Sequence, residues 1–339
     1  METGMLSLVG LGGAGCKIVE LFFRKDLVGS IISKISSGAG HVRGVAIDTS
    51  ESITELSSIP SANMVLIGSS RAKGHGTGGS VEMGKKIMKE ELELAMSTVR
   101  KANIEKPEMI FLIIGIGGGT GTGGAPILAE RIKITYNVPL LGILILPARS
   151  EGALYTKNTF ENFDKFIESL DGVIVLDNNV LANRGEDFIT TYMLVDKAVF
   201  NFLNMVNIGD ILRLVENNIS TLGFMRMKAE HVAIKDILDR AIRNHLYYGI
   251  EGKEFEKINL IIYGNLAEVY GQSFAKNWIK EKYGVEVDYI FMDDKGSKYL
   301  NIGLVITGLK DVTKGFEIKE DKKIMSDLDD LLGDIKPLF

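Results

Sequence analysis

The chain has 339 residues, of which 45% are hydrophobic and 24% charged, and its formal net charge is −5 at pH 7. This balance is typical of a soluble globular protein with room for two domains, and it excludes a disordered or fibrous chain. It also argues against nucleic acid as a partner, because neutralising phosphates requires a concentrated basic face.

Apolar runs alternate with amphipathic stretches in the first half of the chain. Strands are predicted at residues 6–9, 45–47, 64–67, 109–114, 140–146 and 173–176, and helices at 16–23, 81–102 and 122–136. Near-continuous apolar strands are typical of a parallel sheet covered on both faces. We therefore expect a doubly wound α/β sheet over residues 1–184, which binds its ligand at the carboxyl ends of the strands.

The pattern changes after a predicted helix at residues 185–205 and a break at 207–210. Strands are then predicted at residues 219–225, 260–263, 285–291 and 300–307, and helices at 229–246 and 272–283. We expect a central helix and loop over 185–210 and a smaller α/β sandwich domain over 211–309. Residues 310–339 turn polar and charged, which predicts a flexible tail.

Cysteine and histidine usage limits the chemistry. The single cysteine, Cys16, cannot form an internal disulfide, and the first residues lack the features of a signal peptide. No apolar run approaches the ~20 residues that span a bilayer. We therefore expect a protein of the reducing cytoplasm without a transmembrane segment. The 4 histidines show no ligand spacing, so we expect no metal site built from protein side chains alone.

Three glycine-rich segments each follow a predicted strand: GLGGAG at residues 10–15, GHGTGG at 74–79 and GIGGGTGTGG at 115–124. Backbone N–H groups can wrap a phosphate only where Cβ atoms are absent, and a following helix adds its positive N-terminal end. No lysine follows as in a Walker A loop, which excludes a P-loop. A Rossmann dehydrogenase, with Asp48 as its acidic residue, is an alternative, but it would leave two of the three segments without purpose.

The segment GGGTGTGG resembles the phosphate-cradling signature of the tubulin/FtsZ superfamily. VGLGGAG, KGHGTGG, LPARSEG and LDNN resemble its other nucleotide loops, and the forms KGHG, LPARSEGALYT and LDNN are most similar to the archaeal CetZ branch. The resemblance covers residues 6–308 and is strongest before 179. It implies a GTPase that forms head-to-tail filaments with itself, acts in cell shape or division, and uses GTP or GDP with Mg²⁺.

The same resemblance implies roles for individual residues. The phosphates would be held at Gly12, Gly13, Ala14, Gly15, Cys16, Gly117, Gly118, Gly119, Thr120 and Gly121, with Gly76 and Thr77 by the third phosphate. Lys17, where FtsZ commonly has asparagine, and Asp48 are counted in this set. Glu151 would bind the ribose, Asn178 the ribose and base, and Tyr192 would stack on guanine. Asp196, one helical turn later, would accept the two donors of the guanine edge, an arrangement that disfavours adenine.

In this superfamily the loop after the central helix completes the site of the next subunit. Asn207 and Asp210 match that loop, so Asp210 would orient the attacking water in trans. The purely structural interpretation is that Asp210 caps the N-terminus of a helix. The same residue can cap the helix and also orient the water. Only 14 positions separate Asp196 from Asp210, which is short for the family's central helix. The alternative function is therefore a nucleotide-binding structural filament protein with little or no hydrolysis.

The predicted tail contains apolar residues near helical spacing among acids: Met325, Leu328, Leu331, Leu332, Ile335 and Leu338. An apolar stripe that cannot fold alone usually binds a groove on another protein. We expect the tail to bind a partner protein, with a fully solvated tail as the alternative.

Overall fold

A computed structural model describes residues 5–23, 42–182, 202, 206 and 208–314 of the chain. Its first part contains β1 (Leu6–Leu11), α1 (Gly12–Leu21), β2 (Val42–Asp48), η1 (Glu51–Glu55), η2 (Ser61–Asn63), β3 (Met64–Leu66), α4 (Ser69–Ala72), α5 (Val81–Glu90), α6 (Leu92–Ala102), β4 (Met109–Gly115), α7 (Gly119–Tyr136), β5 (Leu140–Leu146), η3 (Arg149–Glu151), α8 (Ala153–Ser169), β6 (Gly172–Asp177) and α9 (Asn178–Ala182).

The second part contains α11 (Ile208–Val215), β7 (Ile219–Lys228), β8 (Val232–Ala233), α12 (Ile234–Asn244), β9 (Lys257–Gly264), η4 (Leu266–Glu268), β10 (Val269–Tyr270), α13 (Gln272–Tyr283), β11 (Glu286–Asp293) and β12 (Tyr299–Thr307). Strands β8 and β10 form a separate parallel pair. Across both parts, no helix that the structure describes is long and apolar enough to cross a bilayer.

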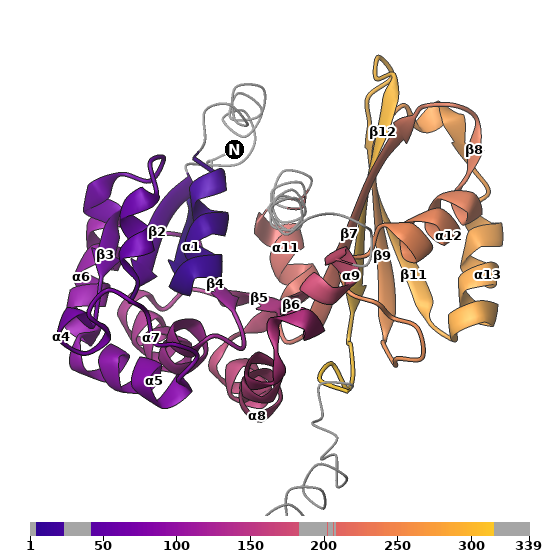
Figure 1. The fold of residues 1–339 in the computed structure, drawn as a ribbon. Coiled ribbons are helices and arrows are strands. Elements are labelled where there is room, and N and C mark those ends of the chain that lie inside the picture. The colour runs from indigo at the N-terminus through magenta and orange to yellow at the C-terminus, as the bar shows by residue number, and fades with distance from the viewer. Residues whose placement is uncertain (1–4, 24–41, 183–201, 203–205, 207, 315–339) are drawn as a thin grey trace, which may run out of the picture.

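The remaining described strands form one ten-stranded sheet in the order β11-β9-β12-β7-β6-β5-β4-β1-β2-β3. The six strands of the first part run parallel, and the sheet continues through a short parallel pairing of β6 with β7. Figure 1 shows the two groups of elements on either side of α9 and α11. The predicted α/β class with a largely parallel sheet is confirmed. The predicted domain boundaries at 184, 210 and 309 stay predictions.

The central strands are buried on both faces, which explains their uninterrupted apolar sequences. Along β4, Leu112 belongs to the core cluster that contains α5, α6 and α7, whereas its neighbours Phe111 and Ile113 belong to the cluster that contains α1 and α11. Successive side chains of a strand point to opposite faces, so one apolar strand supplies both cores. The helices therefore cover the sheet in two layers, and the carboxyl ends of its strands stay open for a ligand.

The predicted helices at 81–102 and 229–246 differ from the structure, the helix predicted at 16–23 begins earlier, at Gly12, and helix α8 was not predicted. Residues 81–102 form two helices because Glu91, with φ −114° and ψ 23°, interrupts them while its carboxylate accepts from the Gly68 N–H at 2.9 Å. The helix predicted at 229–246 begins later, at Ile234, after the short strand β8. Helix α8 was not predicted, because three of its five buried residues are the polar Asn158, Thr159 and Asn162. The predicted helix at 185–205 lies almost entirely outside the described residues.

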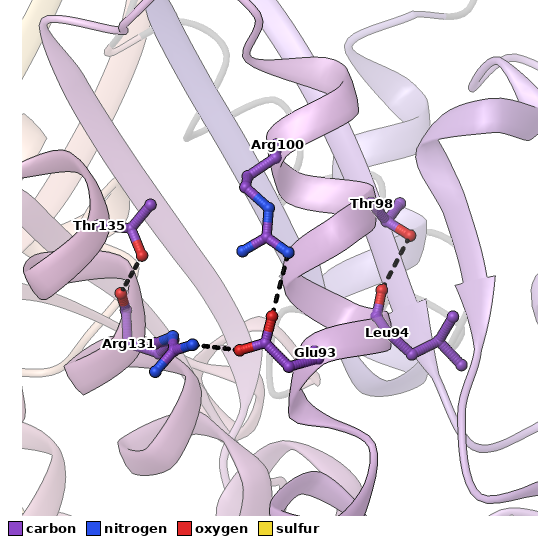
Figure 2. Close-up of polar contacts among 6 residues, drawn as sticks. All are labelled: Glu93, Leu94, Thr98, Arg100, Arg131 and Thr135. Carbon is purple, nitrogen blue, oxygen red and sulfur yellow. Dashed lines mark hydrogen bonds and ion pairs between the residues drawn. The ribbon is translucent and has the colours of Figure 1, made fainter.

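Helices α6 and α7 are joined at the surface by Glu93, whose carboxylate lies between Arg100 of its own helix, at 3.1 Å, and Arg131 of α7 (Figure 2). The Glu93 side chain is 63% exposed. Exposed ion pairs of this kind contribute about 0–1 kcal/mol. Met96 of α6 and Ile132 of α7 belong to the same buried core cluster, so apolar packing contributes more than this ion pair to holding the two helices together.

Candidate functional site

A cleft of about 560 Å³ lies at the carboxyl ends of β1, β2, β4, β5 and β6. Twelve of the predicted binding residues line it: Gly12, Gly13, Ala14, Asp48, Gly76, Thr77, Gly118, Gly119, Thr120, Gly121, Glu151 and Asn178. Five strands that are neighbours in the sheet thus bring segments that are far apart in the sequence to one opening. This is the edge at which open parallel sheets bind ligands.

Not every predicted binding residue lines the cleft. Gly15, Cys16, Lys17 and Gly117 are not among its lining residues. The Cys16 side chain is 2% exposed, and its Sγ faces the carbonyl oxygens of Gly10 and Ile47 at 3.5 and 3.4 Å. Burial raises the pKa of this thiol well above its usual value, so it is a packed neutral group.

Three residues predicted for the site, Tyr192, Asp196 and Asn207, lie outside the described residues. Their roles stay predictions.

The first glycine segment serves packing as well as the cleft. A Cβ on Gly15 would lie 2.1 Å from the carbonyl oxygen of Ile113, so this glycine lets α1 approach β4. Gly12 has φ +75°, a conformation that favours glycine and that turns the chain directly from β1 into α1. Gly13, by contrast, has room for a Cβ and faces the cleft.

Two helices begin at the cleft without a side-chain cap. In the described part of the chain, no side chain accepts from the first N–H groups of α1 or of the 18-residue α7. Uncapped first turns leave N–H donors and the positive ends of two helix dipoles next to each other. Such a pair of helix ends favours an anion with several oxygen atoms.

The loop before α5 is held against α7 by glycines on both helices. A Cβ on Gly84 would lie 2.1 Å from the Gly119 carbonyl oxygen, and one on Gly123 would lie 2.1 Å from the Val81 carbonyl oxygen. The two helices can therefore cross with their backbones in contact. This crossing brings Thr77 beside Thr120, whose hydroxyl lies 3.4 Å from that of Thr77 and 2.7 Å from that of Thr49.

Helix α8 connects two glycine loops through the side chain of Asn158. The buried Asn158 amide donates to the carbonyl oxygens of Gly79 and Gly117, both at 2.8 Å. Both acceptors belong to glycine loops at the cleft, and Asn158 itself does not line it. Its role is therefore to hold the two loops at a set separation.

One end of the cleft, beyond β5 and β6, carries Glu151 and Asn178. The Glu151 carboxylate accepts from the Ala148 N–H at 2.7 Å and from the Asn178 amide at 3.3 Å. Asn178 is 5% exposed, and its Oδ1 has no hydrogen-bond partner among the described residues. A buried acceptor without a donor costs free energy, so this atom indicates a ligand group that donates to it.

Asp177 fixes the turn on which Asn178 stands. Its carboxylate accepts from the Asn179 N–H at 2.7 Å. Burial raises the pKa of Asp177 to about 6, while that N–H and the charge of Lys253 oppose the rise. The carboxylate thus caps α9 and positions the Asn178 side chain.

The opposite end of the cleft, beyond β2, carries Asp48, Ser50, Ser52 and His75. Burial raises the pKa of Asp48, and the N–H groups of Thr49 and Ser50 with the charge of Lys17 lower it in part. His75 and Ser50 are joined as an isolated antiparallel bridge. Sequence reasoning did not assign Ser50, Ser52, His75 or Tyr155 to the site; for His75 the available signal was its place between the glycines of GHGTGG.

The charges of the side chains that line the cleft are unusual for a site that binds a polyanion. Among its described lining residues are the carboxylates of Asp48 and Glu151, and none is lysine or arginine. His75 is the one lining side chain of the described set that can become a cation. Phosphates would therefore be held by backbone N–H groups, hydroxyls and helix ends.

Asp210 lies on a different part of the molecule. It does not line the cleft, and it forms an ion pair with Arg213 at 3.4 Å. Helix α11 ends against the start of β6, where a Cβ on Gly172 would lie 2.2 Å from the Val215 carbonyl oxygen. The cleft is at the other end of β6, so α11 ends at the opposite edge of the sheet.

Residues 6–185 match the Tubulin/FtsZ family, GTPase domain. The chain is 34% identical over 198 residues to the tubulin-like protein CetZ1 of Haloferax volcanii, which covers 58% of this chain and 48% of that protein. The chain therefore spans about half the length of this curated relative.

Solved structures align over more of the chain. The GDP-bound monomer of CetZ1 from Haloferax volcanii gives a TM-score of 0.77 at 26% identity and covers 95% of this chain and 99% of that one. The GTPγS-bound protofilament of CetZ2 from the same organism gives a TM-score of 0.75 at 23% identity, and the alignment covers 96% of this chain and 100% of that one. The similarity to the CetZ2 structure shows a shared fold.

Proposed function

This chain belongs to the Tubulin/FtsZ family, and we propose that it binds GTP in the cleft described above, assembles head to tail into filaments, and hydrolyses GTP between subunits. Its cellular role would be the control of cell shape or of division. Support for assembly comes from its structural relatives, one of which is described as a protofilament bound to GTPγS.

The observation that carries the proposal is the linear arrangement of groups along the cleft. From Asn178 after β6 to Asp48 at the end of β2 the cleft crosses four strand intervals, or roughly 19 Å at the usual strand spacing. An unpartnered acceptor lies at one end, and two helix N-termini lie in the middle. A nucleoside bound at Asn178 and Glu151 would extend its phosphates across α7 and α1 toward Asp48.

Mg²⁺ fits one end of this arrangement. Asp48 is a carboxylate only 3% exposed, and the hydroxyls of Ser50 and Ser52 line the same end. Within the described residues, no group of three or more His, Cys, Asp and Glu side chains could hold a metal ion. We infer that Asp48 and these hydroxyls would hold Mg²⁺ together with the phosphates and water, and that the ion would neutralise phosphate charge.

Asp210, the predicted catalytic acid, does not line the cleft of its own subunit. Asp210 precedes Val215 by five residues, or about 7.5 Å along a helix, whereas β6 is about 16 Å long from Gly172 to Asp177. Even a helix aimed straight at the cleft would leave Asp210 short of it. Asp210 therefore suits the cleft of a neighbouring subunit, where its carboxylate would orient the attacking water.

The alternative is a filament protein that binds GTP and hydrolyses it little. The short segment between the predicted base-reading Asp196 and Asp210, together with the Asp210–Arg213 ion pair, favours this alternative. Steady-state GTP turnover measured against protein concentration, with sedimentation of the same samples, separates the two. We expect turnover per subunit to rise steeply once pelletable polymer forms, whereas polymer with negligible turnover would support the alternative.

We expect Asn178→Ala to weaken GTP and GDP binding by about tenfold each, because both nucleotides would lose the partner of a buried amide. Equilibrium binding of each nucleotide provides the measurement. Asn103→Ala is the matched control, since Asn103 is also 5% exposed with an unpartnered Oδ1 among the described residues but does not line the cleft. Equal losses in both variants would contradict the proposed position of the nucleoside, and ATP affinity equal to GTP affinity would contradict guanine recognition.

A further inference from the structure

We propose that residues 325–338 of the tail bind to this chain's own second part, along the seam between α12 and α13. The seam presents aromatic rings and lysines on one surface, which suits an acidic peptide with apolar side chains. This inference goes beyond nucleotide binding and does not depend on it. The seam residues are His231, Lys235, Tyr270, Phe274, Trp278 and Lys282.

The two helices that form the seam begin side by side, on the side of the second part that faces away from the first (Figure 1). Strands β8 and β10 pair in parallel just before them, and there the rings of His231 and Tyr270 stack with centroids 4.3 Å apart. Further along, Lys235 of α12 lies over Phe274 and Trp278 of α13, at 5.8 and 5.9 Å from the ring centroids. Phe274 and Trp278 are four residues apart, which places them on one face of α13. The seam is therefore a row of rings with a cation beside it.

The seam is open to solvent and includes a lysine without a carboxylate partner in the described part of the chain. Phe274 is 63% exposed, and the stacked rings at the start of the seam are exposed as well. Lys235 is the lysine without a described carboxylate partner, whereas Lys282 pairs with Asp239 at 3.3 Å. Exposed rings beside such a cation favour a ligand that supplies both apolar side chains and carboxylates.

The tail starts close to the other end of the seam. Tyr283, the last residue of α13, contacts Phe255 with ring centroids 5.8 Å apart. The residue after Phe255 is Glu256, which pairs with Lys310 at 2.7 Å. The structure describes the chain up to residue 314. The tail therefore begins a few residues beyond a contact at the end of α13, and its own seam is the first that it can reach.

The tail has the length and the chemistry for this seam. As a helix, the 14 residues 325–338 would be about 21 Å long, against about 18 Å for the 12 residues of α13. The 10 residues before them, 315–324, can span up to about 33 Å, and such a short tether keeps a segment at high effective concentration. Residues 325–338 contain 4 aspartates and 1 lysine among the apolar residues of the predicted stripe. Their carboxylates suit Lys235, and their apolar side chains suit the rings.

The test uses the full chain and its one tryptophan, Trp278, which lies in the seam. Cys16 is buried, so a bimane label attached to Gly333→Cys marks the tail alone. Bimane loses its fluorescence on contact with tryptophan, so we expect quenched emission that Trp278→Phe restores. Phe274→Ser and Lys235→Glu are each expected to raise the ratio of free to bound tail by about tenfold, because the first removes an apolar contact and the second reverses a charge.

Lys276→Glu is the matched control. Lys276 is also an exposed lysine of α13 beside an aromatic ring, 5.5 Å from the centroid of Tyr289, but it lies two residues from Phe274 and so on the opposite face of the helix. It should leave the quenching unchanged, and thermal melts confirm that each variant is folded. Emission that is equal with and without Trp278, or quenching that survives both seam variants, overturns the inference. Equal relief in Lys276→Glu does so too, as does quenching that rises with protein concentration, which would mean that the tail binds another copy.

Discussion

Replacing Asp210 with alanine is expected to slow GTP turnover by about 10²–10⁴-fold while nucleotide affinity stays near that of the wild type. The reason is position: Asp210 does not line the cleft of its own subunit, and α11 ends at the opposite edge of the sheet. In the proposed mechanism its carboxylate would act only on the attacking water of a neighbouring subunit's cleft. Filaments of the variant are expected to persist longer, because hydrolysis would weaken the contact between subunits.

Two further variants separate catalysis from stabilisation of the first turn of α11. Asp210→Asn keeps the size of the side chain and a hydrogen-bonding oxygen, and it is also expected to be slow. Asp236 is an exposed acid in the first turn of α12, as Asp210 is in the first turn of α11, so Asp236→Ala is the matched control. Removing a first-turn acid costs roughly 0.3–1 kcal/mol of stability. The structure places Asp210 inside α11, two residues after its start, and not at the N-cap position. Normal turnover in Asp210→Ala would leave Asp210 as a first-turn acid that stabilises the helix and nothing more.

Replacing Gly13 with tryptophan is expected to lower GTP and GDP affinity by at least about 100-fold, or roughly 3 kcal/mol, with the fold intact. Gly13 lies in the first turn of α1, where an added Cβ would meet only Asp48 Oδ2, at 3.8 Å. The indole would therefore occupy the space proposed for the phosphates, and it would not displace the residues that form the wall of the cleft. Gly119 is a poorer choice, since its Cβ would lie 2.2 Å from the Thr77 hydroxyl oxygen.

Isothermal titration with each nucleotide and a thermal melt without nucleotide measure this effect. The control is Gly296→Trp, because Gly296 is an exposed glycine away from the cleft whose Cβ would meet only the Asp294 carboxylate, at 3.6 Å. It should bind as the wild type does. If Gly13→Trp keeps its nucleotide affinity, the phosphates do not lie over the start of α1.

Together the two variants test catalysis in trans. Asp210→Ala keeps an intact cleft, and Gly13→Trp keeps an intact Asp210, so neither protein alone is expected to hydrolyse GTP. In an equal mixture with random head-to-tail contacts, about a quarter of the interfaces would pair an intact cleft with an intact carboxylate. Activity should return in the mixture. A mixture that stays inactive although the two proteins demonstrably associate would contradict hydrolysis between subunits.

The sequence by itself determined the strands of the ten-stranded sheet and the edge at which the cleft lies. Strand β5 was predicted with its observed bounds, and the three glycine segments were predicted to converge on one edge of the sheet, where residues of all three line the cleft. Both follow from local chemistry, since a strand buried on both faces must be apolar throughout. The carboxyl ends of parallel strands must also share an edge, so the loops after them converge whatever the rest of the fold does.

Only the tertiary structure decided what each glycine and each buried polar residue does. A glycine in the sequence shows that a Cβ is absent but not what approaches it: Gly15 meets a strand, Gly84 meets another helix, and Gly13 meets the open cleft. Asn158 resembles a surface residue until α8 is seen to hold two loops through it. His75 joins the site through its pairing with Ser50. Where these residues have a contact partner, it comes from a segment distant in the chain, so the local sequence does not reveal it.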